Sequence, residues 1–177
     1  MLGRLARAAT GLLALTCVAA AGPEKVDNPA DYLTKFTKIA TRDAHLGGNA
    51  LADVYANDIA LRSGAGESDL ASGAIIAMAV FSAKLNAGEP ALDAEGRMIK
   101  DQLRAVNVME KRTGWGAEYS EALRNGEWEY AGFNPQGVKS ANPTTSCFEC
   151  HGTLKGLPMD FIYTRGELAE AAARMKK

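Results

Sequence analysis

Cysteine and histidine are scarce in this chain of 177 residues, and neither sign of charge prevails. Three cysteines are too few for a scaffold held together by disulfides. Twenty Lys and Arg against 21 Asp and Glu leave a net charge of −1, so the chain has no basic field to attract nucleic acid. The hydrophobic fraction of 47% is that of an ordinary globular protein, which excludes a disordered or collagen-like chain.

The apolar stretch near the N-terminus is too short for a membrane span. It runs from Ala8 to Ala21, whereas a helix that crosses a bilayer needs about 20 apolar residues. Two arginines precede the stretch and small residues end it, a pattern typical of a secretory signal. We therefore predict a signal peptide over residues 1–21, export to a bacterial periplasm, and one domain over residues 22–177 with no membrane span after cleavage.

Cys17 lies inside the predicted signal. Lipoprotein anchoring through Cys17 is a minor alternative, because Thr16 is a poor substitute for the small residue that precedes a lipidated cysteine. We interpret Cys17 as one more apolar residue of the signal. Cleavage then leaves Cys147 and Cys150 as the cysteines of the exported protein.

These two cysteines belong to the pentapeptide Cys147-Phe148-Glu149-Cys150-His151, which has the spacing of a c-type haem attachment site. Two thiols at this spacing add across the two vinyl groups of haem as thioethers, and the adjacent histidine donates an imidazole nitrogen to the iron. We predict one haem c per chain, bound covalently through Cys147 and Cys150, with His151 as the proximal iron ligand.

Two other uses of the motif fit the sequence less well. A structural zinc site needs four ligands, and the exported chain offers only the distant His45 as a fourth. A thioredoxin-like redox pair expects a βαβ context that does not precede this motif.

The position of the motif near the C-terminus limits the kinds of haem protein to which the chain can belong. Small electron-transfer cytochromes carry it near the N-terminus, with a methionine ligand well downstream. Here Met159 follows His151 too closely to loop over the opposite face of the haem. A late motif is shared by two kinds of haem protein, one a helical bundle and the other a β-sheet fold.

Hydrophobic patterning indicates a mixture of strands and helices. Strands are predicted over residues 50–55, 74–81 and 103–109, although the apolar run 74–81 also fits a buried helix. Helices are predicted from Asn28-Pro29 through Ala40, over 57–62 and over 167–177. The Asn125-Gly126 pair predicts a β-hairpin over 115–133, with a helix over 117–124 as the alternative.

Four stretches in order resemble the cytochrome P-460 and cytochrome c′-beta family. They are Val54-Tyr55-Ala56-Asn57, Gly73-Ala74-Ile75-Ile76, Val108 to Gly116, and the haem motif followed by Asp160 to Arg165. The resemblance implies an α+β fold, mainly an antiparallel β-sheet with flanking helices and a C-terminal haem-attachment segment, and commonly a homodimer. The alternative fold is the four-helix bundle of cytochrome c′.

The resemblance also bears on activity. Some family members oxidise hydroxylamine and carry a lysine, five residues after the glycine, that cross-links to the haem ring. Counting from Gly73 places Met78 there, while Lys84 would need a different register. This departure weakens an assignment as a hydroxylamine or nitric oxide oxidoreductase. It favours the members without the cross-link, which bind nitric oxide and carbon monoxide at an apolar distal face.

The sequence therefore predicts an exported haem protein that binds or turns over small nitrogen oxides at a five-coordinate iron. Met78 is interpreted first as an apolar cap on the distal face, then as ordinary core, then as a sixth ligand. Ile76, Met78 and Val80 share one face of the predicted strand. The alternative function is a periplasmic electron carrier that serves a redox partner protein, with Met78 or His45 closing the sixth site.

Overall fold

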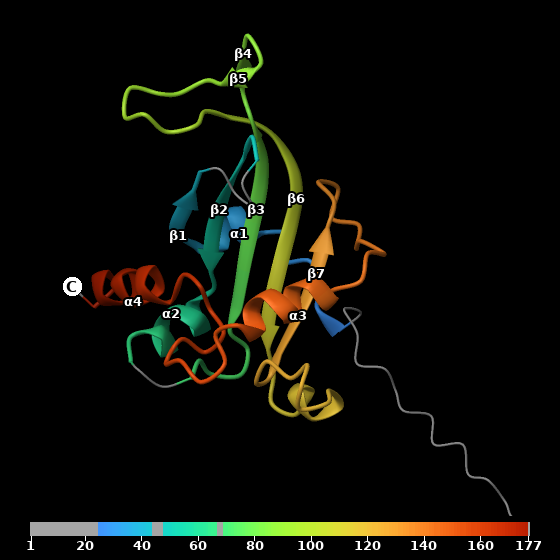
Figure 1. Ribbon diagram of the computed structural model, residues 1–177. Coiled ribbons are helices and arrows are strands. Elements are labelled where there is room, and N and C mark those ends of the chain that lie inside the picture. Colours follow the sequence, from blue (N-terminus) through green and yellow to red (C-terminus); the bar gives the residue numbers. More distant parts are fainter. Residues whose placement is uncertain (1–24, 44–47, 67–68, 177) are drawn as a thin grey trace, which may run out of the picture.

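The computed structural model describes residues 25–43, 48–66 and 69–176 of the chain (Figure 1). The predicted signal over 1–21, with Cys17, and the candidate ligand His45 lie outside the described residues. Within the described part, no helix is both long and apolar enough to cross a membrane.

An antiparallel five-stranded sheet, in the order β1-β2-β3-β6-β7, forms the centre of the fold (Figure 1). Its strands are β1 (Thr37–Arg42), β2 (Ala50–Ala56), β3 (Ile75–Ala83), β6 (Lys100–Lys111) and β7 (Trp128–Phe133). The helices are α1 (Tyr32–Lys35), α2 (Asp58–Gly64), α3 (Thr145–Gly152) and α4 (Arg165–Arg174), together with the 3-10 turn η3 (Trp115–Glu118). The predicted α+β class is confirmed, and the four-helix bundle is excluded.

Alternation along the strands creates two apolar cores, one on each face of the sheet. On one face, which α2, α3 and α4 cover in part, side chains from the strands and helices form a single cluster that includes Ile76, Trp128, Phe148, Ile162 and Leu168. On the other face, the N-terminal segment and α1 cover a second cluster that includes Val26, Tyr32, Ala77, Val106 and Phe133. The haem motif, carried by α3, belongs to the first face.

Most of the predicted elements are confirmed. The strands predicted over 50–55, 74–81 and 103–109 are β2, β3 and β6, and the ambiguous apolar run is a strand. The helices predicted over 57–62 and 167–177 are α2 and α4. Asn57 caps α2 by accepting a hydrogen bond from the backbone N–H of Ala60 at 2.9 Å.

The helix predicted from Asn28-Pro29 through Ala40 is wrong except for one turn. Only Tyr32–Lys35 is helical, and the chain continues as β1. Thr37, Ile39 and Thr41 are β-branched residues in alternation, which favours a strand over a helix. Pairing with β2 then satisfies the backbone groups of this segment.

The predicted hairpin over 115–133 is also wrong, as is the alternative helix over 117–124. β7 pairs with β6, and the segment before Asn125 forms η3 and irregular turns. Gly116 lies so close to the carbonyl of Gly126 that a Cβ on Gly116 would be 1.8 Å from that oxygen. The Asn125-Gly126 pair therefore closes a packed loop rather than a two-stranded turn.

β3 and β6 continue beyond the rest of the sheet into an arm (Figure 1). Ala83 and Lys100 are the last cross-strand pair. The residues between them include the short hairpin of β4 (Leu85–Asn86) and β5 (Glu89–Pro90), and they expose Leu85 and Leu92. Arg97 of the arm reaches back to form an ion pair with Asp43, just past β1.

The close approach of Gly116 and Gly126 can be tested by adding one methyl group. Gly116→Ala should lower the free energy of unfolding by about 2–3 kcal/mol, because the new Cβ must displace backbone rather than a side chain. Gly166→Ala is the matched control, since Gly166 lies in α4 with open space around its missing Cβ. Urea denaturation of both variants should show no loss for the control. Equal midpoints for the two variants would contradict the contact.

Candidate functional site

The helix α3 is fixed to the sheet by the aromatic side chain at its centre. Phe148 is buried between Tyr130 and Tyr119, with ring centroids 4.8 Å and 4.5 Å away. The buried amide of Asn125 donates hydrogen bonds to the carbonyl of Phe148 at 3.0 Å and to the hydroxyl of Tyr130 at 3.1 Å. Phe148 is thus the residue of the motif that holds the helix in place.

Helical geometry brings the three conspicuous residues of the motif together. Cys147, Cys150 and His151 are spaced i, i+3 and i+4 on α3, so their side chains lie on one face of the helix. Both cysteines are free thiols. Cys147 is half-buried and burial raises the pKa of its thiol, whereas Cys150 is exposed.

The ring of His151 is oriented by one backbone contact. Its Nδ1 lies 2.6 Å from the carbonyl oxygen of Phe161, so Nδ1 carries the proton in this contact and Nε2 keeps its lone pair. Burial lowers the pKa of His151, an effect that the Phe161 carbonyl partly offsets. The imidazole is therefore held neutral, with Nε2 as the nitrogen that can bind a metal.

The segment after α3 returns to the motif through a tyrosine. The hydroxyl of Tyr163 donates to the carbonyl of Cys150 at 2.8 Å and is 2.7 Å from the hydroxyl of Thr153. Its ring centroid is 5.5 Å from that of His151. Tyr163 therefore ties residues 153–163 to the end of α3.

A strip of the sheet beside α3 is less covered than the rest. Cross-strand pairing places Val54, Met78, Asn107 and Gly132 in one row, next to the row of Ala52, Val80 and Ala105. Met78, Val80, Ala105, Asn107 and Gly132 are only half-buried, whereas their neighbours Ala77, Ala79, Val106 and Ala131 on the other face are buried. We call these five half-buried residues of the two rows the open strip.

A depression of about 360 Å³ joins the open strip to α3. Its walls include Ala105, Asn107 and Gly132 from the strip, and Thr144, Ser146 and Cys147 from the start of α3. The predicted residues Cys147, Cys150 and His151 are thus on the helix, and Met78 is in the strip on the strand next to Asn107. The shared face predicted for Ile76, Met78 and Val80 is confirmed.

Asn107 is a candidate that the sequence barely signals. Its side-chain oxygen lies over Gly132, where an added Cβ would be 3.4 Å from it. An isolated polar residue on an alternating strand, between Ala105 and Met109, is the only trace of it in the sequence. Lys84 is exposed just past the end of β3, outside the open strip.

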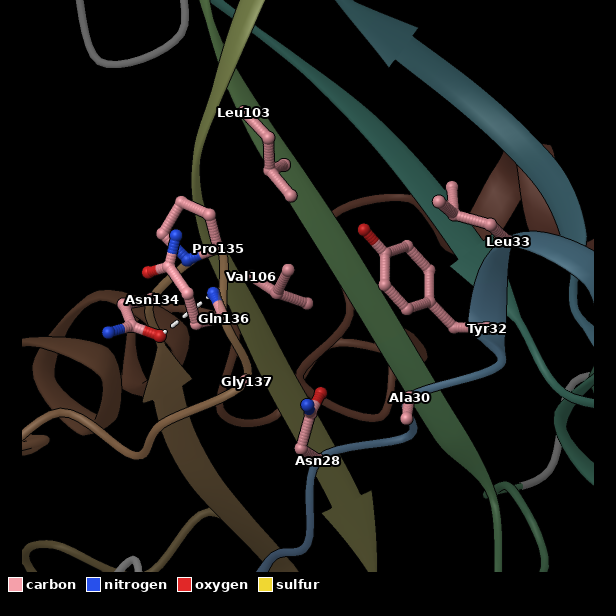
Figure 2. Close-up of a pocket in the computed structure, with 10 residues that line it drawn as sticks. All are labelled: Asn28, Ala30, Tyr32, Leu33, Leu103, Val106, Asn134, Pro135, Gln136 and Gly137. Atoms are coloured by element: carbon pink, nitrogen blue, oxygen red, sulfur yellow. Dashed lines mark hydrogen bonds between the residues drawn. The ribbon is translucent and has the colours of Figure 1, made fainter.

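A second depression, of about 240 Å³, lies on the opposite face of the sheet (Figure 2). Tyr32 and Val106 of the second core line it, together with residues 134–137 that follow β7. None of its lining residues is a cysteine or a histidine. Among the described residues, the candidate ligands Cys147, Cys150 and His151 therefore belong to the face that carries α3.

The residues around α3 suit a haem. Both thiols are free, Nε2 of His151 is available, and the neighbouring open strip presents apolar side chains suited to a porphyrin face. The chain combines an antiparallel sheet with a Cys-x-x-Cys-His helix beside an apolar strip. This combination is typical of a cytochrome with a β-sheet fold.

A comparison with models of protein families identifies the family of the chain. The Cytochrome P460 family model matches residues 29–164, and the chain belongs to this family. The family implies a haem cofactor with its iron and a role in the chemistry of nitrogen compounds. No curated protein matches the chain significantly.

The two hydrogen bonds that Asn125 donates to Phe148 and Tyr130 can be tested by truncation. Asn125→Ala leaves the buried carbonyl of Phe148 and hydroxyl of Tyr130 without this donor, so the free energy of unfolding should fall by about 1–3 kcal/mol. Asn86→Ala, at an exposed position of β4, is the control and should change it by less than about 0.5 kcal/mol. Chemical denaturation measures both, and an Asn125→Ala variant as stable as the control would argue against the anchor.

Proposed function

We propose that the chain is an exported, periplasmic haem c protein that binds or turns over small nitrogen oxides. One haem is held by thioethers to Cys147 and Cys150, with Nε2 of His151 as the proximal ligand. When bound, the haem supplies an iron whose sixth position is open to small ligands. The family membership and the free donor atoms on one face of α3 support this assignment.

The open strip is the observation that carries the proposal. Across β3, β6 and β7 it contains no charged residue, and Asn107 is its one amide. The apolar side chains of the strip disfavour charged ligands, which would lose hydration there without compensation. The polar residues of the adjoining depression, among them Arg104 and Asn142, lie outside the strip. A neutral diatomic such as nitric oxide has no such cost, and the amide of Asn107 offers it a hydrogen-bond donor.

The methionine at position 78 favours the binding of nitrogen oxides over the oxidation of hydroxylamine. It occupies the position where the resemblance implies a cross-linking lysine, and a thioether cannot make that bond. The side chain is half-buried at the edge of the first core and contacts it. We interpret Met78 as an apolar cap, and this interpretation supports a likeness to the members of the family that lack the cross-link.

The second candidate function is electron transfer with a closed sixth site. It is favoured by the thioether of Met78, a known type of axial ligand, on the same strip. This function would require a redox partner protein. A homodimer is compatible with either function and follows from the family resemblance alone.

Covalent attachment is tested by removing the thiols. Cys147→Ala together with Cys150→Ala should abolish the haem that stays with the protein after acid–acetone extraction, because no thioether can form. The wild-type mass should equal the mature chain plus one unmodified haem, with the pyridine haemochrome spectrum of haem c. Covalent haem in the double variant would refute the assignment. A red-shifted spectrum in the wild type would show a lysine cross-link, with Lys84 the first residue to substitute.

The open sixth position is tested by spectroscopy of the reduced holoprotein. Ferrous iron should be high-spin and should bind carbon monoxide and nitric oxide without denaturation. Asn107→Leu should speed dissociation of nitric oxide about tenfold, the loss expected for one hydrogen bond. Stopped-flow measurements give this rate. Low-spin ferrous iron that binds carbon monoxide only after unfolding would instead support the electron carrier.

A further inference from the structure

The buried carboxylate of Asp160, five residues before the start of α4, joins three distant parts of the chain. The side chain of Asp160 is 2% exposed. Its oxygens accept hydrogen bonds from Nζ of Lys111 at 2.8 Å and 2.9 Å, from Nε1 of Trp128 at 3.2 Å and from the backbone N–H of Leu70 at 2.7 Å. These donors come from β6, β7 and the segment before β3, so the carboxylate is held from several sides.

The backbone at this carboxylate is strained. Asp160 and Phe161 have φ values of 45° and 60°, in the left-handed region that residues other than glycine rarely adopt. Such a conformation persists only where surrounding contacts enforce it. The hydrogen bonds of the Asp160 side chain tie this turn to the sheet, in addition to the packing of Phe161 and Ile162 against the first core.

The strained turn presents one carbonyl to the haem motif. The oxygen of Phe161, the residue after Asp160, lies 2.6 Å from Nδ1 of His151. We propose that Asp160, held by Lys111 and Trp128, is a positioning residue for His151, because it fixes the carbonyl that orients the imidazole. This inference rests on the proposed role of His151 as the proximal ligand.

The positioning has an electronic consequence. An imidazole that donates Nδ1–H to a fixed carbonyl is a stronger electron donor through Nε2, which stabilises the ferric state and lowers the reduction potential. Loosening the turn should therefore raise the potential. Loss of the positive charge of Lys111 would act in the opposite direction if that charge affected the iron only through space. Lys111→Gln consequently separates positioning from simple electrostatics.

The structure also provides a matched control. Asp53 is another buried carboxylate, with a side chain 1% exposed, bonded to the hydroxyl of Thr41 at 2.6 Å and to Nζ of Lys100. It lies on the sheet face away from α3, beside Tyr55 of the second core. Asp53→Asn removes the same charge from a similar setting without touching the turn at Phe161.

The experiment compares Asp160→Asn, Lys111→Gln and Asp53→Asn as oxidised, cyanide-bound holoproteins. The hyperfine-shifted Nδ1 proton of His151, observed by NMR, should exchange with solvent at least about tenfold faster in the first two variants and less than about twofold faster in the control. The reduction potential should rise in both Asp160→Asn and Lys111→Gln. Because Lys111→Gln keeps a neutral donor near Asp160, it is informative even where Asp160→Asn fails to fold.

The outcomes separate the two proposals. If the wild-type protein shows no such imidazole proton, the assignment of His151 as the ligand is overturned, and this inference with it. If the wild-type proton is present and its exchange is unchanged in Lys111→Gln, the inference alone is overturned. A lowered potential in Lys111→Gln, or an equal acceleration of exchange in Asp53→Asn, also overturns it.

Discussion

The ion pair between Lys111 and Asp160 is the contact through which the sheet determines the geometry of the C-terminal segment. It joins the end of β6 to a turn 49 residues later in the chain. A buried pair of this kind contributes little net stability by itself, since desolvation offsets much of the attraction, but breaking one partner is costly. Its effect is therefore to select one conformation of the turn. That conformation decides where the Phe161 carbonyl points and hence which nitrogen of His151 stays available.

The two faces of the sheet differ in how completely they are covered. The face covered by the N-terminal segment and α1 is packed with buried alanine, valine and phenylalanine side chains, which makes it a structural core beside the smaller depression. The face that carries α3 is closed at one end by Phe148 and Trp128 and is left partly uncovered along Met78 and Asn107. A sheet can serve as a rigid floor for a ligand only if its other side is well packed. The difference in coverage is what gives the open strip a fixed shape.

Local patterns predicted the parts of the molecule that depend on local chemistry. The alternation of Ile76, Met78 and Val80 defines a strand face, and the cysteine spacing defines a helix face, so both could be predicted without coordinates. Asn125-Gly126 misled the prediction because Gly126 has left-handed backbone, with a φ of 59°, in this packed loop just as it would in a hairpin turn. The contact of Asp160 with Lys111 and the left-handed backbone at Phe161 depend on residues distant in sequence. No local pattern could have predicted them.

The arm at the end of β3 and β6 is a region whose length does not affect the two depressions or the two apolar clusters. Ala83 and Lys100 face each other across the two strands, so a short turn could join them directly. Residues 84–99 line neither depression and belong to neither apolar cluster. Insertions, deletions or a reporter group in this region should thus leave the sheet register intact. The arm can therefore change in length or sequence without altering the two rows of the sheet that lie beside α3.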